Sequence, residues 1–303
     1  MSKMNHFIDK IRENIPSLRL ELEYPLSKLT SFRIGGNAEC AAFPQNEAEL
    51  SELIKMSKEM DMKPLILGAG TNVLAPDEGV RGLVICLKDC LDGMRRVDER
   101  TIRVMAGVTM SRAALFAAGE GLSGLEFAHG IPGSVGGGVF MNAGAYGGEI
   151  KDVCSRVRIV DDNGDCRWLE RDEIGFSYRH SAVQDHPWVV VAAEFTLEPK
   201  PEEEIREKIR ELLSRRTASQ PLDMPSAGSA FKRPVGGYAA ALIESTGLKG
   251  FQVGGAAVST KHAGFVVNMG GATAEDVKSL LQQVSDRVYE HTGIRLEPEV
   301  RIL

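Results

Sequence analysis

The sequence predicts an α+β protein with a larger N-terminal region and a smaller C-terminal domain. Short apolar runs typical of strands alternate with amphipathic helices over 303 residues, a length that suits two or three domains. A segment rich in Pro and Glu opens a new helix near residue 200, where we place the boundary between the two regions. The apolar share of 43% and the charged share of 26% are those of a soluble globular protein.

In the N-terminal region, apolar residues recur at helical spacing over residues 5–15 and again over residues 47–61. Both segments are expected to form amphipathic helices. A third helix is expected over residues 109–119. The expected strands cover KPLIL (63–67) and residues 38–44, 82–87, 101–108, 155–162 and 188–197.

The C-terminal domain begins with EPKPEEEIREKIRELLSRR, whose acidic start and basic end suit the dipole of a helix. A Pro-rich loop follows, and the next expected elements are a helix over 237–246 and strands over 253–259 and 263–269. The last helix is expected to begin at the cap Thr273 and to stop at Gly293. IRLEPEVRIL is expected to finish the chain as a strand.

Composition excludes several functional classes. The net charge of −6 argues against a nucleic-acid-binding surface. The start, MSKMNHFIDKIREN, has no apolar signal-peptide core, and no run approaches the roughly 18 apolar residues of a membrane span. The histidines show no metal-binding spacing such as HExxH, so no catalytic metal is expected. The odd number of cysteines and the absence of CxxC spacing indicate reduced thiols in a cytoplasmic protein: Cys40, Cys86, Cys90, Cys154 and Cys166.

Two glycine-rich stretches are candidates for ligand binding. ILGAGTN is an expected strand that runs into a glycine turn, which is either a phosphate cradle or an ordinary turn. It matches neither the GxGxxG-helix pattern of dinucleotide-binding folds nor the P-loop pattern. Residues 128–148 contain eight glycines in 21 positions, interleaved with apolar residues that favour burial. Two interpretations are open. In the first, the two stretches together enclose a dinucleotide. In the second, residues 128–148 form a tightly packed turn region without a ligand.

Three further segments carry residues suited to chemistry. In GFSYRHS, Tyr178 and Arg179 precede an expected strand, where an arginine often forms only a surface ion pair. In PSAGSAFKRP, small neighbours give the hydroxyl of Ser229 close access to a substrate, but no GxSxG elbow or Ser–His–Asp set accompanies it. Ser229 is therefore a candidate proton donor or a residue of a plain surface loop. In LEPEVRIL, Glu297 and Glu299 would share one face of a strand. That face either lines a site or is exposed to solvent.

Taken together, six motifs occur in an order that resembles the UDP-N-acetylenolpyruvoylglucosamine reductase family. The resemblance runs from about residue 24 to residue 301, and the short interval between the fourth and fifth motifs resembles the compact form of the family. The motifs are TSFRIGG (30–36), LGAGTN (67–72), GIPGSVGGGVFMNAGAYG (130–147), YRHS (178–181), SAGSAFKRP (226–234) and LEPEV (296–300).

The resemblance implies an FAD-binding domain of the vanillyl-alcohol-oxidase (PCMH) type over residues 31–200, made of two subdomains that divide near residue 90. A lead-in over 1–30 precedes it, and a substrate domain over 201–303 follows, with a final strand that returns Glu299 to the flavin. FAD is expected to bind without a covalent bond. The implied cofactor-binding residues are Gly68, Ala69, Gly70, Thr71, Asn72, Gly130, Ile131, Pro132, Gly133, Ser134, Gly136, Gly137, Asn142, Ala143 and Gly144.

The resemblance also implies the reaction, in which NADPH reduces FAD and the enolpyruvyl ether of UDP-N-acetylglucosamine then accepts the hydride. Arg179 and Glu299 would stabilise the resulting enolate, and Ser229 would supply the proton. Because a carboxylate anion would repel the enolate, we expect Glu299 to be protonated, as burial favours. The candidate substrate-binding residues are Tyr178, Lys232, Arg233 and Lys261, with the last three near the diphosphate.

The sequence is compatible with two alternatives of other classes. One is an oxidase of the same fold, whose flavin would be attached covalently, with His129 as the nearest candidate. The other is a nucleotide-sugar-binding protein without catalysis, which would not need Arg179, Ser229 and Glu299 together. In either case, no nucleic acid, membrane insertion or obligatory protein partner is expected.

Overall fold

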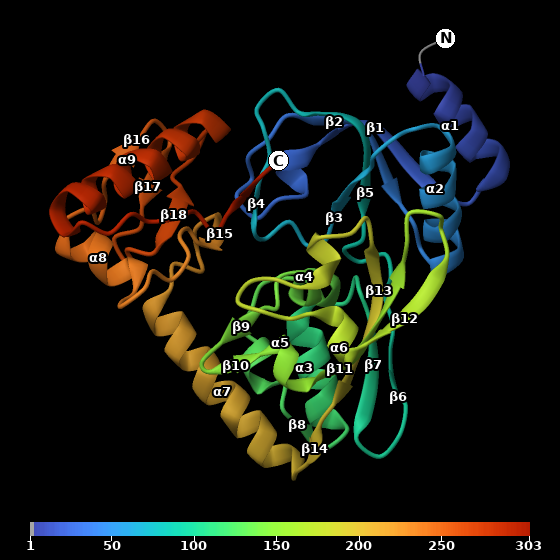
Figure 1. Cartoon of the computed structure of the whole chain (residues 1–303). Helices are drawn as coiled ribbons and strands as arrows, with labels where there is room; N and C mark the ends of the chain where they lie inside the picture. Colours follow the sequence, from blue (N-terminus) through green and yellow to red (C-terminus); the bar gives the residue numbers. More distant parts are fainter. Residues whose placement is uncertain (1–2) are drawn as a thin grey trace. The chain divides into compact units, whose positions relative to one another are not determined.

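The computed structural model describes residues 3–303, which form two compact units (Figure 1). Unit 1 contains the residues up to Leu22 together with Cys40–Ala69 and Gly82–Ser214. Unit 2 contains Glu23–Glu39, Gly70–Arg81 and Arg215–Leu303. Since each unit uses three separate segments, some elements run from one unit into the other: β1 (Arg19–Pro25), β2 (Asn37–Phe43), β5 (Val80–Cys86) and α7 (Glu202–Ser219).

Unit 1 is organised around a five-stranded antiparallel sheet in the order β12-β11-β13-β7-β6. Its strands are β6 (Met94–Arg96), β7 (Thr101–Met105), β11 (Cys154–Val160), β12 (Cys166–Glu170) and β13 (Val189–Thr196). A second sheet has the order β1-β2-β5-β3, in which β3 (Leu65–Leu67) runs parallel to β5. The minor strands are β8 (Leu122–Ser123), β9 (Gly144–Ala145), β10 (Gly148–Glu149) and β14 (Glu198–Pro199).

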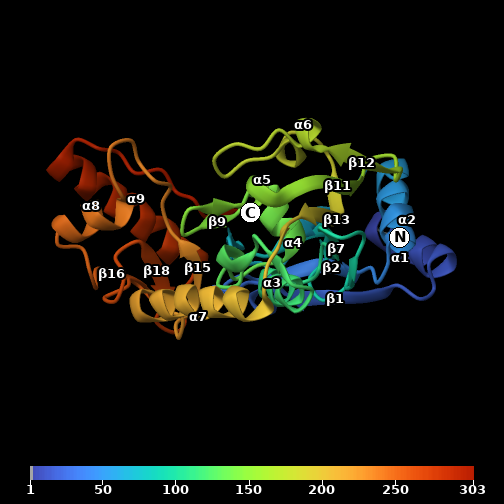
Figure 2. The same cartoon turned by 90° about the horizontal axis from the view of Figure 1, so that it is seen from below.

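The helices of unit 1 bury the apolar faces that the sequence pattern predicts. α1 (Lys3–Asn14) and α2 (Glu47–Glu59) lie side by side in both views (Figures 1 and 2). Phe7 from α1 and Leu50 from α2 are fully buried in one core, which stabilises both helices since burial of apolar area drives their packing. The shorter elements are α3 (Met110–Gly119), α4 (Val135–Phe140), α5 (Ile150–Val153), α6 (Arg171–Ile174), η2 (Glu126–Ala128) and η3 (Ala182–Gln184).

A buried charge cluster joins the strands of the five-stranded sheet. Glu194 on β13 is 3% exposed and pairs with Arg103 at 2.6 Å and with Arg156 at 2.6 Å. Burial alone would raise the pKa of Glu194, but the hydrogen bonds from the two guanidinium groups outweigh it and hold the pKa below its usual range. Both guanidinium groups also lie over the ring of Trp168 on β12, so the cluster spans four neighbouring strands of the sheet.

Unit 2 packs two helices beside a small sheet. The antiparallel sheet has the order β15-β18-β17-β16, and α8 and α9 lie beside its strands (Figures 1 and 2). Its elements are β15 (Ser226–Ser229), α8 (Ala239–Ser245), β16 (Gln252–Val253), β17 (Ala256–Val258), β18 (Phe265–Asn268) and α9 (Ala274–Thr292). A short parallel pair joins β4 (Val73–Leu74) to β19 (Arg301–Ile302), and η1 covers Leu26–Lys28.

The predicted α+β class is confirmed, and the two ends of α9 are where the sequence places them. Thr273 and Asp276 form the capping box, and Gly293 ends the helix with a left-handed φ of 73°. The expected final strand is largely wrong, because only Arg301–Ile302 are paired as β19 and residues 294–300 are not a regular strand. The expected domain limits at residues 31 and 201, and the split near 90, stay predictions.

Candidate functional site

The turn after β3 presents backbone donors to a ligand. Within residues 3–303, the N–H groups of Ala69, Gly70 and Thr71 make no hydrogen bond, while the carbonyl of Gly70 accepts one from the N–H of Ser31 at 3.0 Å. Gly70 has a left-handed φ of 62°, and a side chain there would collide with the carbonyl of Leu29. Consecutive unpaired N–H groups around a left-handed residue are the arrangement that proteins use to bind anions. The turn therefore fits a pyrophosphate.

The second glycine-rich stretch lies against this turn within unit 1. A Cβ atom on Gly68 would lie 2.8 Å from Oγ of Ser134, the residue that caps α4. Ser134 accepts a hydrogen bond from the N–H of Gly137 at 3.5 Å and thereby starts a helix inside the glycine stretch. Two motifs that are far apart in the sequence are thus in contact.

Several glycines of this stretch are needed for protein packing. A Cβ on Gly136 would lie 2.9 Å from Cβ of Ala106, and one on Gly138 would lie 2.8 Å from Sδ of Met110. Gly148 packs in the same way on the ring of Phe127. Real Cβ atoms essentially never approach other heavy atoms so closely, so Gly136 and Gly148 require glycine without any ligand, whereas at Gly138 the flexible side chain of Met110 could move aside. Gly136, which the sequence-based interpretation gives to the cofactor, therefore also has a packing role.

His129 precedes the stretch and has an unmet hydrogen-bonding atom. Its Nδ1 is buried and has no partner within residues 3–303, and burial lowers the pKa of the imidazole. The side chain is therefore favoured in its neutral form. A buried polar atom without a partner costs free energy, so a group bound along this segment would stabilise it. This orphaned nitrogen and the unpaired N–H groups at residues 69–71 both fit a bound cofactor.

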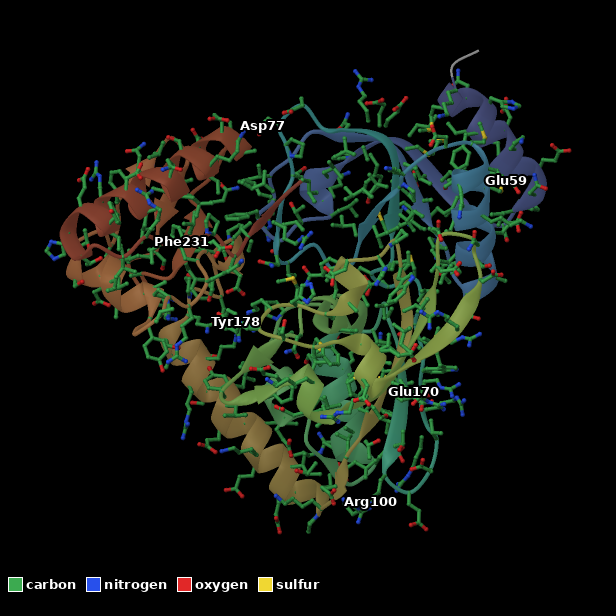
Figure 3. All side chains as sticks on the ribbon, viewed as in Figure 1. Glu59, Asp77, Arg100, Glu170, Tyr178 and Phe231 are labelled. Carbon is green, nitrogen blue, oxygen red and sulfur yellow. The ribbon has the colours of Figure 1, made fainter. Side chains whose placement is uncertain are left out.

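Arg179 lies at the tip of a tight two-residue turn in unit 1. Ser177 and His180 exchange backbone hydrogen bonds at 3.0 and 3.2 Å across it. Arg179 has a φ of 56°, and its guanidinium carbon lies 5.3 Å from the ring centroid of Tyr178, which is 50% exposed. Tyr178 is labelled in Figure 3. A left-handed φ at a residue other than glycine is strained, and such strain often marks a functional position.

Asn142 ties this turn to the glycine stretch. Its Nδ2 donates to the carbonyl of Ser177 at 2.8 Å and to the Glu149 carboxylate at 2.9 Å. Its Oδ1 accepts from the N–H of Lys151 at 3.0 Å, and the residue is 1% exposed. The side chain of Asn142, which the sequence predicts to bind the cofactor, therefore already hydrogen-bonds to three protein groups. The other predicted cofactor residues of this stretch, all in unit 1, are Gly130, Ile131, Pro132, Gly133, Ala143 and Gly144.

Ser229 ends β15 in unit 2 and is exposed. The pairing of β15 with β18 shifts register between Ser226 and Ser229, and Gly228 within this bulge has a φ of 76°. A bulge of this kind redirects a side chain and is frequent beside active sites. The hydroxyl of Ser229 has no hydrogen-bond partner in the described part of the chain. It is therefore available to a substrate.

Backbone hydrogen bonds join the Ser229 segment to the segment of Glu299. The N–H of Glu299 donates to the carbonyl of Ala230 at 2.9 Å, and the N–H of Lys232 donates to the carbonyl of Glu297 at 2.8 Å. On its other side, the carbonyl of Glu299 accepts from Nδ2 of Asn72 at 3.3 Å. Unit 2 thus brings the predicted proton donor, the predicted acid and the end of the LGAGTN turn together.

The predicted substrate-binding cations of unit 2 all have protein partners. Nζ of Lys232 forms an ion pair with Glu297. Nζ of Lys261 donates to the carbonyl of Thr217 at 2.7 Å, near the C-terminus of α7. The guanidinium carbon of Arg233 lies 4.1 Å from the ring centroid of Tyr238, whose side chain is 61% exposed.

Two residues that sequence reasoning missed organise these segments. Ser31, within TSFRIGG, binds the carbonyl of Gly70 through its N–H and the carbonyl of Ser226 through its hydroxyl at 2.5 Å. Asn268 donates to the carbonyl of Phe32 at 3.0 Å. Neither residue type is unusual, so only their occurrence in or near a recognised motif could have marked them.

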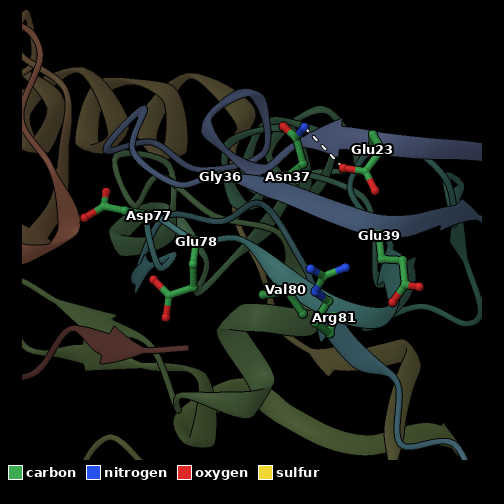
Figure 4. A pocket seen from close by; sticks show the side chains of 8 residues that line it. All are labelled: Glu23, Gly36, Asn37, Glu39, Asp77, Glu78, Val80 and Arg81. Atoms are coloured by element: carbon green, nitrogen blue, oxygen red, sulfur yellow. Dashed lines mark hydrogen bonds between the residues drawn. The ribbon is translucent and has the colours of Figure 1, made fainter.

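One pocket in unit 2 lies apart from these residues. It has a volume of about 330 Å³, and its lining, drawn in Figure 4, is Glu23, Gly36, Asn37, Glu39, Asp77, Glu78, Val80 and Arg81. No residue predicted for catalysis, cofactor or substrate lines it. Among residues 3–303, no group of three His, Cys, Asp or Glu side chains could hold a metal ion. In the same range, no helix has the length and apolar character that crossing a membrane requires.

Two family profiles match the chain. Residues 38–170 match the one described as "FAD binding domain", and residues 220–303 match "UDP-N-acetylenolpyruvoylglucosamine reductase, C-terminal domain". A moss protein from Physcomitrella patens, BBE-like 1, has a TM-score of 0.50 at 16% identity over 65% of this chain and 45% of its own, a likeness of fold alone. The predicted type of FAD-binding domain is thus confirmed.

Relatives match over nearly the whole chain. Proteins named UDP-N-acetylenolpyruvoylglucosamine reductase from Agathobacter rectalis and Caldanaerobacter subterraneus are each 44% identical over 98% of this chain, covering 98% and 97% of their own lengths. The crystal structure of UDP-N-acetylenolpyruvylglucosamine reductase from Thermus caldophilus has a TM-score of 0.78 and 35% identity, over 94% of this chain and 98% of its own.

Proposed function

Because the chain belongs to the UDP-N-acetylenolpyruvoylglucosamine reductase family, we propose that it reduces UDP-N-acetylglucosamine enolpyruvate to UDP-N-acetylmuramate with electrons from NADPH. The product is a peptidoglycan precursor, and the reaction takes place in the cytoplasm. One observation carries the chemical part of the proposal. The N–H of Glu299 is bonded to the residue after Ser229, so a candidate acid and a candidate proton donor lie on adjoining segments.

FAD, when bound, supplies the hydride-transfer chemistry that side chains lack. The N–H groups of Ala69, Gly70 and Thr71 hold its pyrophosphate, as their unpaired state supports. The segment from Gly130 to Gly144 holds the remainder of the cofactor without a covalent bond.

A substitution at Gly70 tests this binding site. Gly70→Val is expected to give folded protein depleted of flavin, because a β-branched residue disfavours the φ of 62° and its Cβ would collide with the carbonyl of Leu29. The control for the backbone strain alone is Gly293→Val, at a φ of 73° on the open end of α9, where a Cβ would meet no neighbouring atom. It should lower the melting temperature and retain flavin. Full flavin occupancy in Gly70→Val would contradict the assignment.

The side chains act on the charge that develops when hydride reaches the terminal carbon of the enolpyruvyl group. Arg179 meets the substrate carboxylate with paired N–H donors and so lowers the energy of the enolate. Glu299, in its protonated form, donates a hydrogen bond to the same species. Ser229 then gives its proton to the carbon beside the carboxylate, which completes the reduction.

Lys232 and Arg233 offer positive charge to the diphosphate of the substrate, as their positions four residues or fewer after Ser229 support. Lys261 is the third candidate, although its ammonium group is already bonded to a helix carbonyl. Tyr178, which is half-exposed beside Arg179, is the aromatic candidate. The reaction needs no metal ion and no second protein.

Product analysis tests the proposed function. The purified protein, mixed with NADPH and the enolpyruvyl ether, should yield UDP-N-acetylmuramate with one NADPH consumed for each product molecule, as mass spectrometry and absorbance report. A nucleotide-sugar-binding protein would consume no NADPH. An oxidase would consume oxygen instead, and a flavin attached at His129 would stay with the chain after denaturation. Either of these results would overturn the proposal.

A further inference from the structure

Gln184 bridges the glycine stretch and the turn that carries Arg179. Its Nε2 donates to the carbonyl of Phe140 at 2.7 Å and to the carbonyl of Arg179 at 3.0 Å. The same nitrogen lies 4.0 Å from Sδ of Met141, a weak acceptor, so the two carbonyl groups are its main partners. Phe140 is the last residue of α4, and all three residues belong to unit 1. Gln184 therefore fixes Arg179 to the end of the helix in the glycine stretch.

The backbone of Arg179 needs such support. Its φ of 56° lies in the left-handed region, where the second position of a tight turn normally favours glycine. A strained residue keeps its conformation only when its surroundings over-determine it. The bond from Gln184 is made to the carbonyl of the strained residue itself. Without it, the peptide between Arg179 and His180 keeps the bond from the N–H of His180 to the carbonyl of Ser177, at 3.2 Å, and the guanidinium group is held less firmly.

Two other polar side chains attach the flanks of the same turn. Asn142 donates to the carbonyl of Ser177 at 2.8 Å, and the hydroxyl of Ser181 donates to the carbonyl of Phe140 at 3.0 Å. The turn is thus anchored before and after its tip on residues 140–142. Gln184 alone among these three makes its bond at Arg179, which separates its contribution from general anchoring of the loop.

We propose that Gln184 is a positioning residue for Arg179, holding its strained backbone so that the guanidinium group meets the substrate carboxylate. This inference rests on the proposed role of Arg179. Gln184 touches neither substrate nor cofactor and acts through the carbonyl that it binds. Its removal is therefore expected to impair the step that uses Arg179 and to leave the reduction of the flavin by NADPH intact.

The first test is Gln184→Met, which keeps the length of the side chain and removes both donors. Oxidation of the reduced flavin by the enolpyruvyl substrate should slow about 10–100-fold, the range expected when a catalytic group is slightly misplaced. Flavin reduction by NADPH should stay within about twofold of the wild type on the same reasoning. Isothermal calorimetry should show weaker binding of UDP-N-acetylmuramate, whose carboxylate Arg179 also meets.

The matched control is Gln45→Met. Nε2 of Gln45 also donates to a backbone carbonyl in unit 1, that of Phe43 at 3.1 Å, and the bond is likewise partly buried. This control should lower the melting temperature as much as Gln184→Met does and should leave both half-reactions unchanged. Equal slowing of substrate reduction in both variants would assign the effect of Gln184 to stability alone and overturn the proposal.

A double-mutant cycle separates the roles of the two residues. Arg179→Ala should slow substrate reduction strongly, and Gln184→Met added to it should slow the step less than about twofold further, because contacts that act through one group are not additive. Additive slowing would overturn the positioning role. If Arg179→Ala alone has no effect, the proposed role of Arg179 fails, which is a different result from an inert Gln184→Met.

Gln184→Glu provides a second variant should the methionine variant fold poorly. It keeps the shape of the side chain, but at neutral pH it places a carboxylate against two carbonyl oxygens. Protonation restores one donor, so the rate of substrate reduction in this variant, relative to the wild type, should rise as the pH falls. A pH profile parallel to that of the wild type would contradict the hydrogen-bonding role.

Discussion

The two units hold their proposed catalytic residues in different ways. In unit 1, side-chain amides hold the turn of Arg179, through bonds from Gln184 to its carbonyl and from Asn142 to the carbonyl of Ser177. In unit 2, backbone groups hold Glu299, whose N–H binds the carbonyl of Ala230. The neighbouring pair, from the N–H of Lys232 to the carbonyl of Glu297, continues the same ladder.

This difference determines which substitutions are expected to change the rate of substrate reduction. A backbone ladder is independent of side-chain identity, so in unit 2 only the reacting side chains themselves should matter greatly. A turn held by side chains loses its geometry when a residue several positions away is changed. We therefore expect indirect effects in unit 1 to be large and indirect effects in unit 2 to be small.

The largest effect is expected for Ser229→Ala. Loss of the proton donor should slow reoxidation of the flavin by substrate about 10²–10⁴-fold, or roughly 3–5 kcal/mol of barrier. Flavin reduction by NADPH should be near normal, and Ser229→Cys should retain part of the second step because a thiol also gives a proton. Stopped-flow absorbance measures each half-reaction separately. Equal slowing of both would mean that Ser229 shapes the flavin pocket.

Glu299→Ala should come next, with a loss of about 10²–10³-fold in the same half-reaction, the range for removal of one donor to a developing anion. Glu299→Gln keeps a donor and should lose less. Glu297→Ala is the control two residues away, since its carboxylate pairs with Lys232 at the surface. Steady-state turnover of the three variants is the measurement. Equal losses for Gln and Ala at 299 would count against a protonated Glu299.

Asn72→Ala tests the one side-chain bond to the Glu299 segment. The bond from Nδ2 to the carbonyl of Glu299 is long, 3.3 Å, while the backbone bonds on both sides persist in the variant. A hydrogen bond of this kind contributes about 0.5–1.5 kcal/mol, so substrate reduction should slow by less than about tenfold. The flavin content of the variant would show separately whether Asn72 also binds the cofactor, as the resemblance implies. If Asn72→Ala slowed substrate reduction more than Gln184→Met does, indirect effects would be larger in unit 2 than in unit 1, contrary to the account.

The smallest effect concerns the pH dependence of stability and involves one partly buried histidine in each unit, His129 and His262. Burial lowers the pKa values of His129 and His262, so the unfolded chain binds protons more readily than the folded protein. The free energy of unfolding should therefore fall as the pH drops below about 6.5 and be insensitive to these groups above it. The fall should be reduced in His262→Leu, where Nδ1 no longer accepts from the N–H of Gly264. The measurement is the urea midpoint of unfolding at several pH values. A midpoint that does not change with pH would contradict this expectation.

Local signals predict local structure well in this chain. The capping box of Thr273 and the stop at Gly293 define α9 because both act within one helical turn. The final strand is overestimated because pairing with β4, rather than alternation of residue types, defines it. α4 is missed because glycine disfavours helices in isolation, and here contacts with Ala106 and Met110 override that preference.

The residues of the candidate site also differ in whether local sequence marks them. Ser229 stands out in the sequence because small residues surround it, and Gly70 because it ends an apolar run. Gln184 and Ser31 do not stand out, since their importance lies in which carbonyl groups they bind. Those partners are distant in the sequence or lie across a turn, so no pattern of residue types encodes them.

The most direct test of the reductase assignment is the visible absorbance of the purified protein in the absence of oxygen. The account predicts a yellow protein whose flavin band bleaches on addition of one equivalent of NADPH. The band should then return on addition of UDP-N-acetylglucosamine enolpyruvate, and it should not return on addition of UDP-N-acetylglucosamine. A flavin that stays bleached until oxygen is admitted would contradict the account.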